Sequence, residues 1–170
     1  MKRMCGQAET MIRRVARKLV VHSAEQIALL YENEDVVRRY RVSTAANGLG
    51  CSADSNCTPY GKLTIAEKIG FDLREGAVLS NREPTGQIWS QAESSPLLSS
   101  KEDLVLTRIL WLAGKESQNA NTLGRHIYVH GTNHENDLGY PVSHGCIRVS
   151  NKDIIELFDL LHVGDEVEID

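Results

Sequence analysis

Several features are missing from this 170-residue chain, and each absence excludes a class of protein. The net charge is −4, so no basic excess draws the chain to nucleic acid or to anionic lipid. No run of residues approaches the roughly 20 consecutive apolar residues of a membrane-spanning helix. Residues 1–6 are partly basic but no apolar segment follows them, so no secretory signal is predicted. We therefore expect no nucleic-acid partner and no membrane span.

The usual spacings of zinc ligands are missing as well. No Cys-x-x-Cys pair is present, and His134-Glu135 lacks the second histidine of His-Glu-x-x-His. Five candidate metal ligands do lie within 21 residues: His126, His130, His134, His144 and Cys146. Gly131 and its β-branched neighbours favour a strand that leads into a loop over a helix with ligands on one face. We therefore expect no metal and no cofactor, and a zinc site is the alternative.

Three of the four cysteines have no assigned chemistry. Cys51 and Cys57 flank a polar loop, and two interpretations stay open for them. In the first, they form a small disulfide, which would indicate an oxidising compartment. In the second, they are two free thiols. Both stay open because spacing alone does not fix the geometry that a disulfide needs. Cys5 is uninformative.

The residues that are present predict one globular, mainly β domain. Hydrophobic residues make up 41% of the chain and charged residues 25%, which is typical of a soluble protein. Apolar or alternating stretches predict strands at residues 19–21, 27–31, 36–44, 62–68, 104–112, 126–130 and 166–169. Residues 32–35 form the turn of a hairpin, and residues 47–61 and 70–102 are predicted loops.

Two helices are predicted. Residues 8–19 have an amphipathic pattern, and a second helix runs to about residue 161 with Ser150 as N-cap and Asp153 at the third position. The expected fold is a β-sandwich of mixed sheets with one helix packed after a cysteine loop, plus the short N-terminal helix. Residues 1–17 are expected to be an extension, and residues 18–170 the folded domain.

The strongest chemical signal is a cysteine that follows a histidine by 16 residues, Cys146 after His130. A cysteine is a strong nucleophile as a thiolate, and a neighbouring imidazole can take its proton. Gly145 allows backbone amides to approach a substrate carbonyl, as an oxyanion hole requires. Arg148 adds a planar donor for a substrate carboxylate. Each residue also has a structural alternative. Cys146 could be a buried structural thiol, His130 an ordinary strand histidine, and Arg148 a partner in a surface salt bridge.

The run Ser143-His144-Gly145-Cys146-Ile147-Arg148, after Ile127-Tyr128-Val129-His130-Gly131-Thr132, resembles the active-site signature of the YkuD-type L,D-transpeptidases. These are bacterial enzymes that remodel peptidoglycan. Thr58-Pro59-Tyr60-Gly61 is similar to a Thr-Pro-x-Gly element of that family, and residues 42–44 and 107–112 match further blocks. The resemblance covers roughly residues 18–170, and four blocks in the right order rarely arise by chance.

The resemblance implies a role for each residue of the signature. Cys146 would be the nucleophile, His130 the general base, and the carbonyl of Gly131 the group that orients the imidazole. His144 and Gly145, with the Cys146 amide, would shape the oxyanion hole. Arg148, Ser143, Thr132 and Tyr128 would contact the substrate, Arg148 through a carboxylate of the donor. The Thr58-Pro59 turn is not expected to belong to the site.

By the same resemblance, the substrates are peptidoglycan stem peptides. The cysteine would form a thioester with the diaminopimelate of a tetrapeptide, release D-alanine and transfer the acyl group to an amine, giving a 3-3 cross-link. Water, a D-amino acid or a protein lysine are alternative acceptors. Residues 70–102 and 131–142 are the candidate acceptor loops. A non-catalytic wall-binding module is the alternative of another class.

Location and assembly follow from the resemblance too. Such enzymes act in the periplasm or cell envelope, and the protein is expected to be a monomer. Because no signal peptide is predicted in this chain, a cytoplasmic or non-classically exported protein stays open as well.

Overall fold

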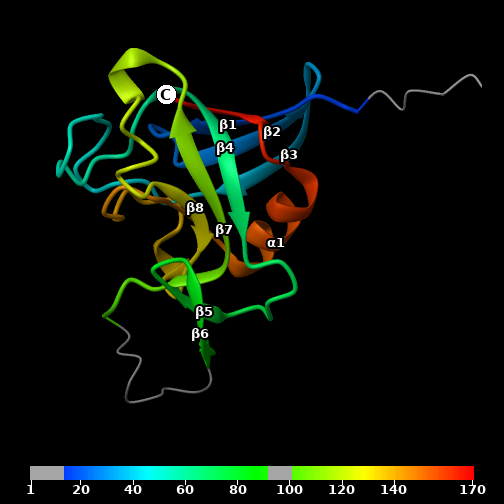
Figure 1. Cartoon of the computed structure of the whole chain (residues 1–170), viewed down its shortest axis with the longest axis vertical. Helices are drawn as coiled ribbons and strands as arrows, with labels where there is room; N and C mark the ends of the chain where they lie inside the picture. The colour runs from blue at the N-terminus through cyan, green and yellow to red at the C-terminus, as the bar shows by residue number, and fades with distance from the viewer. Residues whose placement is uncertain (1–13, 92–100) are drawn as a thin grey trace, which may run out of the picture.

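The computed structural model describes residues 14–91 and 101–170. Strands are the main regular element of the structure (Figure 1). The strands are β1 (Arg17–His22), β2 (Ile27–Glu32), β3 (Asp35–Arg41), β4 (Gly61–Ile69), β5 (Ala77–Ser80), β6 (Glu83–Ile88), β7 (Val105–Gly114), β8 (Tyr128–Gly131), β9 (Ile147–Val149) and β10 (Glu166–Ile169). The helix is α1 (Asn151–Leu160), and two short 3-10 turns are η1 (Ser117–Asn119) and η2 (Glu135–Asp137).

All of these strands belong to one hydrogen-bonded network with mixed pairing. The order is β3-β2-β1-β10-β4-β7-β5-β6, and a branch leaves β7 through β8 to β9. The β1–β10 and β8–β9 pairs are parallel, and the other pairs are antiparallel. The predicted fold class is therefore confirmed as mainly β with mixed pairing and one helix after the cysteine loop. Among the described residues, no helix is long and apolar enough to cross a membrane.

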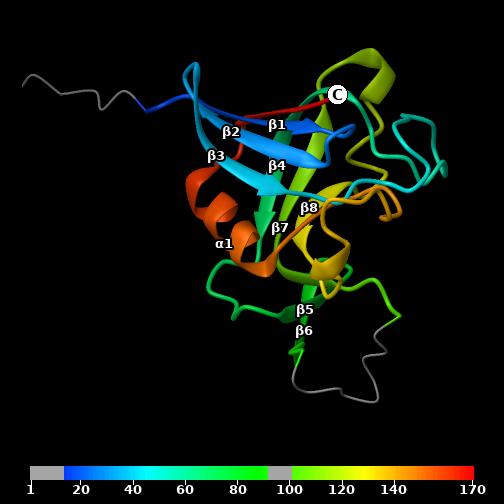
Figure 2. The ribbon, with the colours of Figure 1, turned by 180° about the vertical axis from the view of Figure 1, so that it is seen from behind.

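One apolar core joins the two parts of the network. Strands β1, β2, β4, β7, β8, β9 and β10 contribute side chains to this core. Helix α1 covers the core and packs against β7 and β8 (Figure 2). Ile154, Leu157 and Phe158 form the buried face of α1. The predicted N-cap is confirmed, since Ser150 Oγ accepts a hydrogen bond from the Asp153 amide at 3.0 Å.

The predicted N-terminal helix does not reach its predicted end. Residues 17–19 belong to β1, and residues 8–13 lie outside the described residues. These residues form a strand because β1 pairs with a neighbouring strand on each side. Leu19 lies opposite Val167 of β10 and opposite Leu30 of β2. Long-range burial outweighs local propensity here, because Leu19 is almost fully buried. The division of the chain at residue 17 stays a prediction.

The segment predicted as loop at residues 70–102 contains a hairpin, β5–β6. Its turn is Asn81-Arg82, with φ values of 48° and 68°. Positive φ at both central residues is the geometry of a type I′ turn, which suits the twist of a two-residue hairpin. β5 also pairs with β7. The hairpin therefore lies at the end of the molecule away from β1–β3 and brings its turn toward β8 (Figure 1).

Candidate active site

The cysteine loop, residues 143–146, is held by hydrogen bonds to its own backbone and to a distant turn. Ser143 Oγ donates to the Cys146 carbonyl at 2.6 Å and accepts from the Gly145 amide at 3.3 Å. Thr58 Oγ1 donates to the Gly145 carbonyl at 2.9 Å. Gly145 has φ 133°, a conformation that a side chain would strain. Thr58, which sequence reasoning left out of the site, therefore fixes the loop that carries the cysteine.

The thiol of Cys146 is half-buried against the start of β8. Its Sγ accepts from the Tyr128 amide at 3.3 Å and donates to the His126 carbonyl at 3.4 Å. Burial raises the pKa of the thiol from 9.0 to about 11, and the Tyr128 amide opposes that shift because it stabilises a thiolate. At neutral pH the sulfur therefore carries its proton.

His130 lies on β8 and is almost fully buried. Its Nδ1 is 2.6 Å from the Gly131 carbonyl oxygen, which can only accept, so Nδ1 carries the proton and Nε2 has a free lone pair. Burial lowers the pKa of His130 below its ordinary 6.5, even though the Gly131 hydrogen bond acts in the opposite direction. The imidazole is thus neutral at pH 7 and can accept a proton through Nε2.

The parallel ladder between β8 and β9 sets the relation of Cys146 to His130. Val129 lies opposite Ile147, and both side chains point into the core. Because alternate residues of a strand face opposite sides, Tyr128 and His130 point to the other face, and so does Cys146 just before β9. The cysteine and the histidine therefore share one face of this strand pair.

Arg148 is buried, and its charge already has a partner. Its Nη2 lies 2.6 Å from Asp103 Oδ2, and the exposed His144 has Nδ1 at 3.5 Å from the same oxygen. Asp103 is a member of the site that sequence reasoning missed, and it precedes β7 with no motif around it. Arg148 is therefore engaged by Asp103 through Nη2, while its buried Nε has no partner among the described residues. The substrate role of Arg148 stays a prediction.

A buried polar network fixes the backbone after His130. Asn151 Nδ2 donates to the Thr132 carbonyl and to Glu135 Oε1, both at 2.8 Å, and Thr107 Oγ1 donates to Asn151 Oδ1 at 2.6 Å. A Cβ on Gly131 would lie 2.4 Å from Asn151 Oδ1, so no side chain fits there. Thr132 is itself fully buried, with Oγ1 accepting from the His134 amide at 3.0 Å. The network holds the Gly131 carbonyl against the imidazole.

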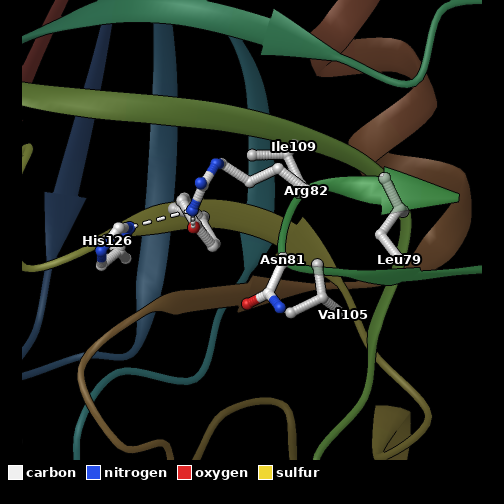
Figure 3. A pocket seen from close by; sticks show the side chains of 7 residues that line it. Leu79, Asn81, Arg82, Val105, Ile109 and His126 are labelled. Carbon is white, nitrogen blue, oxygen red and sulfur yellow. Dashed lines mark hydrogen bonds between the residues drawn. The ribbon is translucent and has the colours of Figure 1, made fainter.

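Figure 3 shows a cavity of about 310 Å³ whose lining includes His126 and Tyr128, the two residues with backbone groups hydrogen-bonded to the thiol. It is lined by Leu79, Asn81, Arg82, Val105, Ile109, His126 and Tyr128. Cys146 packs against the apolar cluster that Leu79, Ile109 and Tyr128 form in this lining. The cavity therefore offers space for a substrate whose carbonyl reaches the sulfur, and Tyr128 is the one predicted substrate contact that lines it.

The candidate metal ligands point to different partners. His126 stacks on Trp111, His134 Nε2 lies 3.0 Å from the Glu102 carbonyl, and His144 faces Asp103. Within residues 14–91 and 101–170, no group of three or more His, Cys, Asp or Glu side chains could hold a metal ion. Cys51, Cys57 and Cys146 are free thiols, which favours the second interpretation of the Cys51 and Cys57 pair.

The match to a protein family decides the identity of the fold. The YkuD model, described as the L,D-transpeptidase catalytic domain, matches residues 16–169. The chain belongs to this family. Among individual relatives of the YkuD family, the putative L,D-transpeptidase YkuD of Bacillus subtilis is 47% identical over 45 residues, 26% of this chain and 27% of the relative. The probable L,D-transpeptidase ErfK/SrfK of Salmonella typhimurium is 35% identical over 91 residues, 52% of this chain and 29% of the relative.

Solved YkuD-family structures show the same fold at low identity. An L,D-transpeptidase of Xylanimonas cellulosilytica superposes with a TM-score of 0.57 at 22% identity, covering 93% of this chain and 62% of that one. L,D-transpeptidase 3 of Mycobacterium tuberculosis, in complex with a faropenem-derived adduct, gives 0.56 at 16% identity, covering 91% and 60%. The chain spans about a quarter of the curated relatives and about three-fifths of the solved chains.

Proposed function

We propose that this YkuD-family domain is a cysteine-dependent L,D-transpeptidase acting on peptidoglycan stem peptides. The observation that carries the proposal is the neutral, buried His130, whose Nδ1–H is held by Gly131 while Nε2 is free on the face that it shares with Cys146. A general base requires that protonation state and that orientation. A binding module has no need of either, which counts against the non-catalytic alternative.

The first half-reaction forms a thioester. Cys146 transfers its proton to His130 Nε2 as its sulfur attacks the carbonyl of the L-centre of diaminopimelate. The Gly145 amide already donates to Ser143 Oγ, whereas within the described part of the chain the His144 and Cys146 amides have no acceptor. These two amides would hold the oxyanion. The carbon–nitrogen bond to D-alanine then breaks, and the leaving amine takes the proton from His130.

The second half-reaction restores the thiol. An amine of a second stem peptide attacks the thioester and gives its proton to His130, and the proton returns to the sulfur as the carbon–sulfur bond breaks. The product is a 3-3 cross-link. Water or a D-amino acid in place of the amine would give a carboxypeptidase or an exchange reaction through the same intermediate. This chemistry needs no cofactor, and we propose a monomer working in the cell envelope.

The remaining predicted residues receive roles from their contacts. We propose that Ser143 shapes the cysteine loop, because its hydroxyl is buried and bonded within the loop. Thr132 belongs to the network that holds the base. Tyr128 contributes its amide to the sulfur and its ring to the cavity wall.

The proposal is tested with purified disaccharide-tetrapeptide and mass spectrometry. The intact protein is expected to release D-alanine and form a cross-linked dimer, and Cys146→Ala is expected to do neither. Cys51→Ala is the matched control, because it removes a thiol away from the cavity and should retain turnover. Release of D-alanine without a dimer would favour hydrolysis. Absence of turnover in every sample would reject the tetrapeptide donor.

A solved relative carries a faropenem-derived adduct, which supplies a second probe. We expect faropenem to add its mass to the peptide that contains Cys146 and to no other cysteine peptide.

A further inference from the structure

We propose that Arg82, at the tip of the β5–β6 hairpin, binds a carboxylate of the acyl donor in the cavity beside Cys146. The inference rests on the proposed function only in that the donor reaches the thiol through this cavity. It moves the carboxylate-binding role from Arg148, to which the sequence pattern points, to a residue that no motif contains.

Three aromatic groups hold Arg82 at the cavity, and Figure 3 shows its contact with one of them, His126. Its guanidinium lies 4.6 Å from the centre of the Trp111 ring. Its Nη1 donates to His126 Nδ1 at 3.1 Å and to the Tyr128 hydroxyl at 3.2 Å. Both hydrogen bonds leave from one nitrogen, so the Nε and Nη2 hydrogens are free of partners within the described residues. A guanidinium with two free donors can bind a carboxylate in a bidentate way.

The charge of Arg82 is not balanced by the cavity itself. Arg82 is the only permanently charged residue in the cavity lining, and it forms no ion pair within the described residues. His126 Nδ1 accepts from Arg82, and an imidazole nitrogen adds no negative charge to balance the guanidinium. A guanidinium without a counter-ion among the described residues can bind an anionic group of a ligand.

The other arginines near the thiol are already engaged. Arg148 is buried and paired with Asp103 at 2.6 Å. Arg125 directs its guanidinium to the carbonyls of Gly50 and Cys57, at 3.1 Å and 2.7 Å. Of the three, Arg82 alone lines the cavity, and it has no carbonyl or carboxylate partner in the part of the chain that the structure describes.

The rest of the cavity defines the ligand that fits. Leu79, Val105 and Ile109 form an apolar wall, and Asn81 adds one amide beside Arg82. An aliphatic chain that ends in a free carboxylate would bury its methylenes on this wall and place its charge at the guanidinium. The cavity therefore selects a donor with a free carboxylate over the same donor with that group amidated.

The first test does not depend on transpeptidation. Cys146 is alkylated with iodoacetate, an anion, and with iodoacetamide, its neutral counterpart, and each rate is read by mass spectrometry of the Cys146 peptide. We expect Arg82→Gln to lower the iodoacetate-to-iodoacetamide rate ratio by about tenfold, the loss of one charge-assisted hydrogen bond. Arg82→Lys should keep most of the ratio. Arg39→Gln, on exposed β3 far from the cavity, should not change it.

The second test uses the stem peptide with the donor carboxylates free or amidated. Arg82→Gln is expected to lower kcat/KM for the free form about tenfold and to leave the amidated form unchanged, with thermal melting showing that the variant is folded. Equal losses for both forms, or an unchanged alkylation ratio, would overturn the proposal. If no stem peptide reacts but the alkylation ratio falls, the proposed function fails and the anion subsite stands.

Discussion

The resting state of Cys146 is a neutral thiol beside a neutral imidazole. Burial raises the pKa of the thiol to about 11 and lowers the pKa of His130, so each shift disfavours an ion pair between them. The proton therefore leaves the sulfur only as the carbonyl arrives. We therefore expect Cys146 to react slowly with simple thiol reagents at neutral pH and faster with a ligand that fills the cavity.

The alkylation of Cys146 by iodoacetamide should reveal this state. Because the thiolate is the reactive form and the folded pKa is raised, we expect the rate to climb about tenfold per pH unit from neutral pH to above pH 9. The measurement is the modification of the Cys146 peptide, followed by mass spectrometry so that Cys51 and Cys57 do not interfere. A rate that is already level near pH 7 would show a thiolate–imidazolium pair instead.

Residues of the site differ in how far the sequence could reveal them. Cys146, His130 and Gly131 lie in two short runs whose spacing is a recognisable pattern. Asp103, Arg82 and Asn151 reach the site from three separate segments, and no local pattern marks any of them. Their positions follow from strand pairing with β7 and from the cap of α1, which are decided by the whole fold.

At the start of α1, Asn151 links three elements through one side chain. It reaches η2 through Glu135, the end of β8 through Thr132, and β7 through Thr107. Thr107 has φ 74°, an unfavourable conformation for a β-branched residue, at an irregularity in the β7–β8 ladder. The Asn151 bond and a second bond from the Gly76 amide to Thr107 Oγ1, at 2.9 Å, offset that cost.

Asn151→Leu should therefore destabilise the domain by about 2–4 kcal/mol, because the buried Thr132 carbonyl loses its donor and the buried Thr107 hydroxyl loses its acceptor. Urea unfolding followed by circular dichroism measures the loss. Lys152→Ala, at the exposed neighbouring position of the same helix turn, is the control and should change stability by less than about 0.5 kcal/mol. Equal stabilities of the two variants would contradict the role of the network.

The elements were predictable where local chemistry decides them. The β2–β3 hairpin has a polar turn between apolar strands, and α1 begins at a capping serine, so both agree with the structure. The β5–β6 hairpin was missed because β6 is exposed along its whole length and contains Pro84 and Gly86, which are typical of loops. Its existence depends on the pairing of β5 with β7.

On the scale of the whole molecule, β10 joins two halves of the network. It lies between β1 and β4, parallel to the first and antiparallel to the second. Its Val167 and Ile169 are buried in the common core. In the strand order, β1, β2 and β3 therefore join β4 and β7 through β10. The segment after β3 makes a second, shorter connection to the site, because Ser43 forms a bridge with Arg148 of β9 and Ala45 with Ser143.

Deletion of residues 166–170 should prevent folding of the domain. The deletion exposes the unpaired edges of β1 and β4 and removes two core side chains, a loss of several kcal/mol in a protein whose total stability is about 5–15 kcal/mol. Circular dichroism and thermal melting measure the outcome. Glu168→Ala, which changes an outward-facing side chain of the same strand, should retain a cooperative transition. A cooperative transition in the deletion variant would contradict the central role of β10.

The position of β10 also determines the order in which the sheet can form during synthesis on the ribosome. The three strands β1–β3 emerge early and can form a meander, yet the neighbour that must cover the open edge of β1 is synthesised after every other strand of the domain. Until then the nascent chain presents an unpaired apolar edge, the kind of surface to which chaperones bind and through which chains aggregate. Final closure of the sheet is thus a late, long-range event, and the catalytic loop forms on a scaffold that is still incomplete.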